Sequence, residues 1–585
     1  MEKDFGITEY ACGGRMEPVP CLLKEMFSDF IVQEILADQH VLTIPSPDTI
    51  IESTGKKEVI MIQEDVEKPA FLTDELVAQL DERFAAKGPP VVISVEKLEK
   101  DERKQIHLFV RERYAGKLMS EMKDDGILVS HGHTNSTRKR KIWDDNIPKE
   151  CHFTMCKENK ETSYALGILA KFLGVKQDMM KTHGIKDKRG VTAQRVSCRQ
   201  VLESKVLGLN STLRGILVYD CEYKNEPLQM GGHWGNRFSI VLRNVPTESE
   251  PLLHERLESF QNTGFINYFG TQRFGSRESP TSEIGLAILK RDWEKAVKMI
   301  LKNSSLPKHL DFGTTGAAIR CFEETGNPKW AYSKLKGAQA FATTEAAIFK
   351  CLSRDGTWQQ AITEAIPQHT RSLYVHAYQS LLWNHAASRR VKENGIHVQE
   401  NDVGVDGKPL GEHATHYDIH IPLPGENEAF EESYGCEWIK EMLEKDGLTV
   451  ESFTSLKDRF SLGEASRPLF AEAKDLKWTF IHYTEPRCML QDGLKTRAIS
   501  HAEQVGPLLA LQLQFSLGSG SYATVALREV TGNDMGKYSM KNASEKARVE
   551  NEKAEARKER EAMKKDEPEE VKDEPEEVKD EVVDE

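Results

Sequence analysis

Apolar residues that alternate with polar ones, or that form short runs, predict strands in four parts of the chain. Met179–Cys198 holds two such runs on either side of a loop rich in glycine and lysine, which predicts a strand, a tight loop and a second strand. Cys21–Ile35 has alternating polar positions after Asp29, Phe238–Leu242 alternates cleanly, and Leu509–Val530 is also β-type. The predicted strands therefore come from the beginning, the middle and the end of the chain.

Apolar residues spaced three and four positions apart predict helices between these strands. In one of them the flanking residues define the ends, because Thr162 is predicted as the N-cap and Gly174 as the residue that stops the helix. Residues 276–485 are mostly of this helical type. The helices predicted by spacing are Phe71–Ala86, Asp101–Glu121, Ser163–Leu173, Thr281–Lys302 and Ser372–Glu393.

Length and composition limit the class of protein. With 585 residues the chain is too long for one hydrophobic core, so we expect several folded units. No apolar run reaches the roughly 18 residues of a membrane span, and the first ten residues are too charged for a signal peptide. The ten cysteines are scattered, which favours reduced, mostly buried thiols in an intracellular protein.

The net charge of −14 is unevenly distributed. Residues 541–585 hold 11 basic and 18 acidic residues, so half of the excess negative charge lies there. Lys541–Met563 could form a charged helix, and the repeated KDEPEEV at 565–571 and 572–578 is predicted to be disordered. Binding of RNA would therefore have to depend on local basic clusters in the rest of the chain.

One such cluster surrounds Asp187, at the tip of the loop in Met179–Cys198. The neighbouring cations would favour the ionised carboxylate and attract a polyanion. The alternative is a solvated basic turn in which the aspartate only balances charge, and residue types alone leave both readings open. The cluster consists of Lys181, His183, Lys186, Lys188, Arg189 and Arg195.

Several motifs resemble those of the TruD family of pseudouridine synthases, and they occur in the family's order. GIKDKRGVTAQ resembles the signature that carries the catalytic aspartate, CLLKEMFSDFIVQEI the first motif, and FINYFGTQRFG the third. The closing segment FSLGSGSYATVALREV also resembles the family's, with Gly518 and Ser519 where prolines are common. The matching residues are Lys24, Asp29, Phe30, Val32, Glu34, Asn159, Lys160, Thr162, Gly184, Lys186, Asp187, Lys188, Thr192, Gln194, Asn267, Phe269, Gln272, Arg273, Phe274 and Gly275.

The resemblance implies roles for these residues. Asp187 would be the catalytic carboxylate, Lys24 its partner, Phe269 the residue that stacks on the target base, and Asn267 a loop-shaping residue. From residue types alone, aromatics beside an arginine suit a nucleobase, but a buried aromatic cluster at a strand end fits them as well. We predict RNA contacts for Lys186, Lys188, Arg189, Gln272 and Arg273.

The architecture implied is α+β. A catalytic domain with an antiparallel sheet would be assembled from residues 1–45, 149–275 and 486–540, and residues 276–485 would form the TRUD insertion domain facing it across an RNA cleft. Residues 46–148 resemble the insertion of eukaryotic members, a small α/β module that binds nucleic acid. Residues 541–585 would be a charged, largely disordered acidic tail.

The function implied is isomerisation of uridine to pseudouridine in tRNA, at position 13, and in other RNAs including messenger RNA. The reaction contains no redox step or phosphoryl transfer, so we expect no metal, cofactor or nucleotide, and we expect a monomer. Asp187 could add to C1′ as a nucleophile or take the C2′ proton, and the sequence does not choose. The rival readings are a catalytically inactive RNA-binding relative of the same fold, and a scaffold protein that uses the acidic tail.

Three further sequence patterns suggest a function but also have a simpler structural interpretation. The basic run RKRK at 138–141 favours the nucleus over the cytoplasm, or is a solvated loop. His413, His416, Asp418 and His420 suggest a metal site, but the strand-like sequence around them favours a cluster without one. Gly518 and Gly520 lack the Gly-Lys-Ser/Thr that a phosphate-binding loop needs.

Overall fold

The structure is a computed structural model of the chain. The basic run RKRK, most of residues 46–66 and the KDEPEEV repeats lie outside the residues that it describes. The described residues are 2–14, 16–47, 62–63, 65–85, 89–96, 98–114, 117–123, 126–131, 143, 147–275, 279–304, 314–341, 343–425, 435–460, 462, 465–494, 496–499, 505–536 and 539–549.

Nine of the described strands form one sheet, in the order β15-β16-β10-β2-β8-β6-β9, with β1 also on β10 and β7 also on β8. Neighbours are antiparallel except β2 and β8, which run parallel. The α+β class predicted from the resemblance is therefore confirmed, with one parallel pair in the antiparallel sheet. The strands are β1 Leu22–Leu23, β2 Phe30–Ile35, β6 Glu150–Glu158, β7 Met180–Thr182, β8 Val191–Arg199, β9 Ile216–Lys224, β10 Gly235–Val245, β15 Lys474–Tyr483 and β16 Leu508–Gly518.

The parallel pair decides what lies together at one edge of the sheet. Ile31 pairs with Val191, close to the first residue of each strand. Because parallel strands start at the same edge, the loops that precede β2 and β8 meet there. Gly190 makes the approach possible, since a Cβ atom on it would lie 2.5 Å from the Phe30 carbonyl oxygen. The loops brought together in this way carry Lys24 and Asp187.

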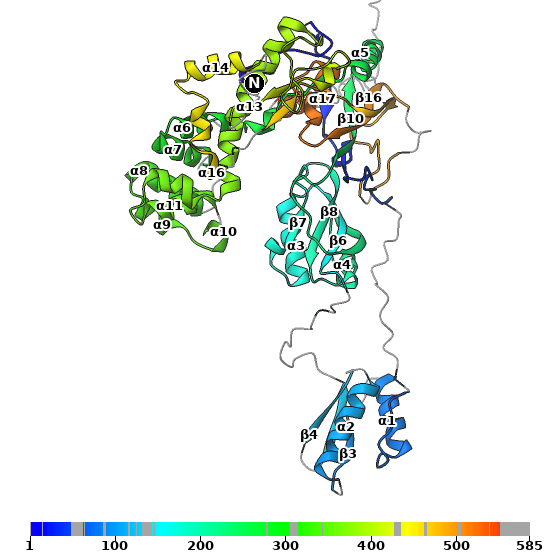
Figure 1. Cartoon of the computed structure of the whole chain (residues 1–585). Coiled ribbons are helices and arrows are strands. Elements are labelled where there is room, and N and C mark those ends of the chain that lie inside the picture. The colour runs from blue at the N-terminus through cyan, green and yellow to red at the C-terminus, as the bar shows by residue number, and fades with distance from the viewer. Residues whose placement is uncertain are drawn as a thin grey trace, which may run out of the picture.

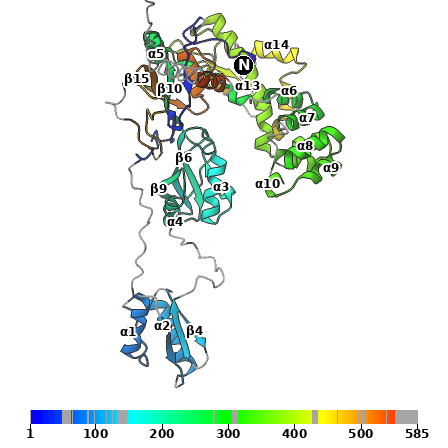
Figure 2. The ribbon, with the colours of Figure 1, turned by 180° about the vertical axis from the view of Figure 1, so that it is seen from behind.

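Helices α3 (Thr162–Leu173) and α4 (Glu203–Gly208) cover the β8-β6-β9 part of the sheet, where they bury an apolar core that includes Phe153, Leu169 and Val206 (Figure 2). Gly174 ends α3 in the left-handed conformation, with φ of 71°, as predicted. The predicted N-cap is wrong, because α3 begins at Thr162 itself and Glu161 is the capping position. The Thr162 hydroxyl bonds instead to the loop that carries Asp187.

The described residues between 279 and 394, and between 436 and 460, are mostly helical (Figure 1). The single helix predicted over Thr281–Lys302 is two helices, since the chain turns at Arg291, which has a left-handed φ of 62°. The predicted helix Ser372–Glu393 lies within α13, the longest of this group. The main helices here are α6 Thr281–Leu289, α7 Trp293–Ser304, α8 Thr314–Thr325, α9 Pro328–Lys334, α10 Ala338–Phe341, α11 Thr344–Leu352, α12 Trp358–Gln360, α13 Gln368–Asn394, α14 Cys436–Lys445, α15 Glu451–Thr454 and α16 Lys457–Phe460.

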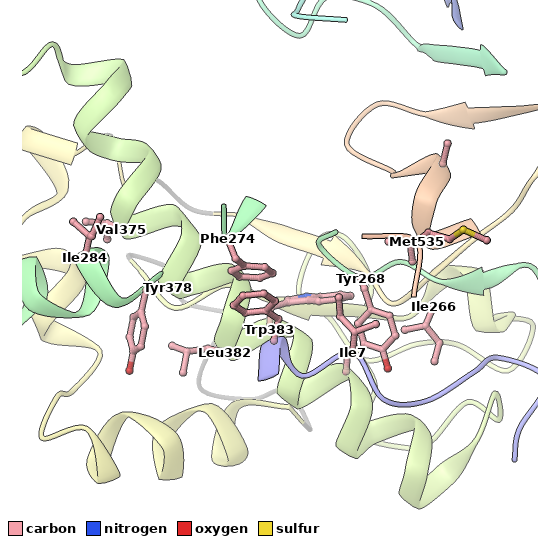
Figure 3. Close-up of a cluster of buried hydrophobic side chains, with 14 of the residues drawn as sticks. Ile7, Ile266, Tyr268, Phe274, Ile284, Val375, Tyr378, Leu382, Trp383 and Met535 are labelled. Carbon is pink, nitrogen blue, oxygen red and sulfur yellow. The ribbon is translucent and has the colours of Figure 1, made fainter. Parts of the chain in front are cut away.

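The helical region and the sheet share one continuous apolar core. Figure 3 shows Ile7 from the N-terminal segment, Tyr268 from the loop after β11 (Phe265–Ile266) and Trp383 from α13 in one buried cluster. The region predicted as an insertion over 276–485 also ends earlier than expected, because β15 pairs along β16 and belongs to the sheet. Short strands link the two parts: β12 His420–Pro422, β13 Ser466–Pro468 and β14 Phe470–Ala471.

The segment between β2 and β6 contains a small α/β unit with its own core (Figure 1). Strands β3 (Val91–Ser94), β5 (Gly126–His131) and β4 (Leu118–Lys123) pair in that order, with α1 (Asp74–Ala85) and α2 (Lys100–Arg113) beside them. The predicted helix Asp101–Glu121 was too long, because α2 ends at Arg113 and the chain enters β4 at Leu118.

The last described residues depart from the prediction at one point and agree with it at another. The β-type stretch expected up to Val530 changes after β16 into the helix α17, Ala523–Thr531, which packs against α5, Glu250–Thr263. Residues 539–549 are helical, which agrees with the charged helix predicted over Lys541–Met563 as far as the structure describes that segment. Among the described residues no helix, the 27-residue α13 included, is both long and apolar enough to cross a membrane.

Candidate active site

Lys24 and Asp187 form an ion pair at the edge where β2 and β8 begin. The Lys24 Nζ atom lies 3.0 Å from Asp187 Oδ1, and the two side chains are 16% and 33% exposed. The same ammonium sits 3.5 Å from the centroid of the Phe30 ring. The carboxylate of Asp187 therefore lies beside a cation and is still open to solvent, as a group that must meet a substrate has to be.

The position of Lys24 depends on a break between β1 and β2. Lys24 has a left-handed φ of 64°, and a 3₁₀ turn over Phe27–Asp29 follows it before β2 starts. Arg243 on β10 holds that turn through two hydrogen bonds of 2.8 Å to the Asp29 carboxylate. Both partners are buried, so the turn that presents Lys24 is fixed by a bidentate ion pair.

The backbone of the loop before β8 is held by three polar side chains from inside the domain. Thr162 at the start of α3 accepts from Lys186 N at 3.1 Å, and Gln194 on β8 donates to Gly184 O at 3.1 Å. Lys157 on β6 donates to Asp187 O at 2.7 Å. Asp187 is therefore presented by a loop whose backbone polar groups are satisfied on the inner side.

Lys157 is a functional residue that the sequence did not single out. Its side chain is buried, and burial lowers its pKa to about 8 even though the charge of Asp187 acts in the opposite direction. Its only sequence signal is its place at the start of KENKET, on the strand that precedes Asn159–Thr162.

Lys186 is placed differently from the prediction. The sequence predicted an RNA contact, but the side chain is only 4% exposed and its ammonium lies 3.0 Å from Glu34 Oε2 and 2.6 Å from Asn236 Oδ1. Burial accordingly lowers the pKa of Lys186, against the charge of Glu34. A phosphate cannot reach this ammonium from outside, so the lysine anchors the loop instead.

Glu34 is the centre of this buried network. Its Oε1 atom lies 2.9 Å from His183 Nδ1 and accepts from Arg195 N at 3.2 Å. Burial alone would raise the pKa of Glu34, but the hydrogen bond from His183 and the charge of Lys186 outweigh it, and the pKa is lowered. The carboxylate thus stays charged inside the protein and ties β2 to both ends of the Asp187 loop.

A cavity of about 650 Å³ opens in front of the ion pair. Lys24 and Asp187 line it together with Lys188, Arg189 and Gln272, so three of the residues predicted to contact RNA surround the predicted catalytic carboxylate. Arg273 and Phe269 are not among its lining residues. On the loop after β11, the first residue that lines the cavity is Thr271, two residues after Phe269.

Phe269 is half-buried on the loop after β11, against the helical region. Its ring meets Trp383 of α13 edge-on, with centroids 5.6 Å apart at 87°, and the Arg467 guanidinium lies 4.0 Å from its centroid. The amide of Asn384 pairs with both backbone groups of Phe269. The ring is therefore held in one orientation by its packing and its backbone.

Asn267 and Arg467 shape the loop that carries Phe269. Asn267 is buried, and Arg467 donates to its carbonyl oxygen at 2.7 Å and to its Oδ1 atom at 2.9 Å. Arg467 also donates to Gly520 O at 2.9 Å. The sequence assigned Asn267 a loop-shaping role but gave Arg467 none; its only signal was the SRPL segment in the helical region.

The known proteins that this chain resembles are pseudouridine synthases. A family model described as tRNA pseudouridine synthase D (TruD) matches residues 132–530. A Caenorhabditis elegans protein named as a pseudouridine synthase is 68% identical over 94% of this chain and 95% of its own length. Multisubstrate pseudouridine synthase 7 of Schizosaccharomyces pombe is 29% identical over 90% of each chain.

A solved structure shares the fold. The crystal structure of a tRNA pseudouridine synthase D (TruD) from Methanosarcina mazei aligns with a TM-score of 0.52, over 91% of this chain and 98% of that one. Its sequence identity is 19%. The likeness therefore concerns the architecture rather than individual side chains.

Proposed function

The chain belongs to the TruD family of tRNA pseudouridine synthases and is an isomerase that acts on RNA, and from this premise we propose that it converts the uridine at position 13 of tRNA to pseudouridine. The observation that carries the proposal is the ion pair of Lys24 and Asp187, 3.0 Å long, on the wall of a cavity bordered by Lys188 and Arg189. A carboxylate kept charged beside basic side chains suits a reaction at the ribose of a polyanion.

The isomerisation breaks the bond between N1 of uracil and C1′ of ribose and forms a bond between C5 and C1′. The C5 proton is lost and N1 gains one, so the product has the composition of the substrate. Asp187 would either add to C1′ while uracil leaves, or take the C2′ proton to give a glycal-like intermediate. Both routes need the ionised carboxylate, and Lys24 lies 3.0 Å from it as its ion-pair partner.

The target base has to leave its stack to reach Asp187. In the proposal, Phe269 holds the detached uracil while it turns, and its fixed orientation against Trp383 and Arg467 serves that purpose. Lys188, Arg189 and Gln272 are exposed residues of the cavity rim and would contact the flanking nucleotides. Arg273 would contribute from beside the rim.

We also propose a wider substrate set. The Schizosaccharomyces pombe relative is named multisubstrate, which supports action on RNAs other than tRNA, messenger RNA among them. The α/β unit of residues 62–131 would add to the RNA-binding surface, and the basic run at 138–141 would direct the protein to the nucleus.

The test uses two transcripts of one tRNA, one with uridine at position 13 and one with cytidine there. Pseudouridine is located at single-nucleotide resolution after incubation with the full-length protein, without nucleotide and with a chelator present. We expect product at position 13 of the first transcript only. Equal product from both transcripts, or product elsewhere, would refute the proposed target.

A further inference from the structure

Helix 539–549 forms one wall of the catalytic cavity. Six of its residues line the cavity: Met540, Lys541, Ser544, Glu545, Ala547 and Arg548. Their spacing places them on one face of the helix, whereas Lys546 lies off that face. The family match ends at residue 530, so this wall is not assigned by the resemblance.

Helix 539–549 contacts the segment that carries Lys24, at the edge of the sheet where β2 and β8 begin. Ser544 donates to the carboxylate of Glu25, the residue next to Lys24, and Arg189 donates to the Glu25 carbonyl oxygen at 3.3 Å. Met540 packs against the shared apolar core. A substrate strand that enters the cavity therefore passes between the Asp187 loop and this helix.

The charge of the helix is suited to a nucleic acid. Residues 539–549 carry three basic residues and one acidic residue, whereas residues 550–585 are strongly acidic. Lys541 and Arg548 line the same cavity as Lys188 and Arg189. With the helix in place the cavity still measures about 650 Å³, within the size range of ligand sites, so the helix borders the site without filling it.

We infer that helix 539–549 is part of the substrate site, and that Lys541 and Arg548 bind phosphates of the RNA strand beside the target uridine. The inference rests on the proposed function, because it takes RNA as the occupant of the cavity. The two cationic rims would hold the backbone on both sides of the flipped nucleotide.

The test compares Lys541→Gln and Arg548→Gln with Lys546→Gln, which removes the same charge from the same helix away from the cavity. Dissociation constants for the tRNA transcript are measured with full-length proteins over a series of salt concentrations. Each cavity-facing variant should bind 3- to 10-fold more weakly and lower the slope of log K against log salt by about 0.7, the value for one single-strand phosphate contact. Lys546→Gln should match the wild type, and all melting temperatures should agree.

Three results would overturn the inference: no effect from either cavity-facing variant, an equal effect from Lys546→Gln, or tighter binding, which would mean that the helix competes with RNA. Pseudouridine formation by the wild type is measured on the same samples. Absence of product with the predicted binding pattern would refute the proposed function and leave the RNA-binding wall supported.

Discussion

The Asp187 loop and the Phe269 loop meet near one cavity but are held in place by different forces. The Asp187 loop rests on buried charges and hydrogen bonds from Glu34, Lys157 and Thr162. The Phe269 loop rests mainly on the apolar core, with the buried cation of Arg467 over the ring and neutral amide hydrogen bonds from Asn384 to its backbone. A reacting carboxylate needs a defined charge environment, whereas a residue that holds a base needs a fixed flat surface. Substitutions that change charge should therefore disturb the Asp187 loop most, and substitutions that change the shape of a side chain should disturb the Phe269 loop most.

The largest effect is expected from Glu34→Gln, which keeps the shape of the side chain and removes its charge. Lys186 would be left buried beside a neutral group, and breaking a buried pair in this way costs about 3–5 kcal/mol of unfolding free energy. Glu222→Gln is the matched control, because Glu222 is an exposed partner of Arg195 and should cost about 1 kcal/mol or less. Chemical denaturation measures both variants, and equal stabilities would contradict the charge-based account of the Asp187 loop.

Arg467→Met tests the other loop. The substitution keeps much of the apolar stem but leaves the carbonyl oxygens of Asn267 and Gly520 without this donor, at a cost of about 2–4 kcal/mol. We expect kcat to fall with the stability while the dissociation constant for RNA changes less than threefold, and Arg467→Lys to be intermediate. A loss of RNA affinity with unchanged kcat would mean that Arg467 contacts the substrate rather than positioning Phe269.

The pKa of Lys157 gives the Asp187 loop a pH-dependent stability. A lysine whose pKa falls to about 8 on folding opposes folding fully below that pH, and the penalty shrinks as pH rises toward the unfolded value of 10.5. The unfolding free energy of the wild type should therefore rise relative to Lys157→Met by about 2 kcal/mol between pH 7 and pH 9.5. A pH-independent difference between the two proteins would show that this ammonium is not desolvated.

The smallest effect is expected at Phe269, where ring shape can be changed alone. Phe269→Tyr keeps the flat ring and should retain most of kcat/KM, while Phe269→Leu should lose about 1–3 kcal/mol of transition-state stabilisation, the value of one stacked base. Single-turnover rates on the tRNA transcript separate the two. If leucine served as well as tyrosine, stacking would not be the role of this residue.

The sequence predicted parts of both loops and missed a residue in each. Strands β2, β7 and β8 followed from patterns that are contiguous in the chain, and the family resemblance implied the pairing of Lys24 with Asp187. Lys157 and Arg467 were missed because their roles arise from contacts with residues 30 and 200 positions away. Lys186 was misjudged because a short basic motif does not show which lysine faces a buried glutamate.

The errors in secondary structure have a similar origin. Thr162 looked like an N-cap, but its hydroxyl is used by the Asp187 loop, a tertiary contact that propensity does not contain. Apolar runs did not distinguish the helix α17 from a strand after β16. The helix at 539–549 was predicted within Lys541–Met563, but its basic character was hidden because net charge was averaged over 541–585.

In the proposed reaction the charged loop supplies the reacting group, which is the carboxylate of Asp187. The most direct test is single-turnover pseudouridine formation by Asp187→Asn, with the fraction of bound tRNA measured in the same reaction. The account predicts a folded protein that binds the transcript with an affinity within threefold of the wild type and yields no product in the time in which the wild type converts all of it. Product formation within tenfold of the wild-type rate would contradict the account.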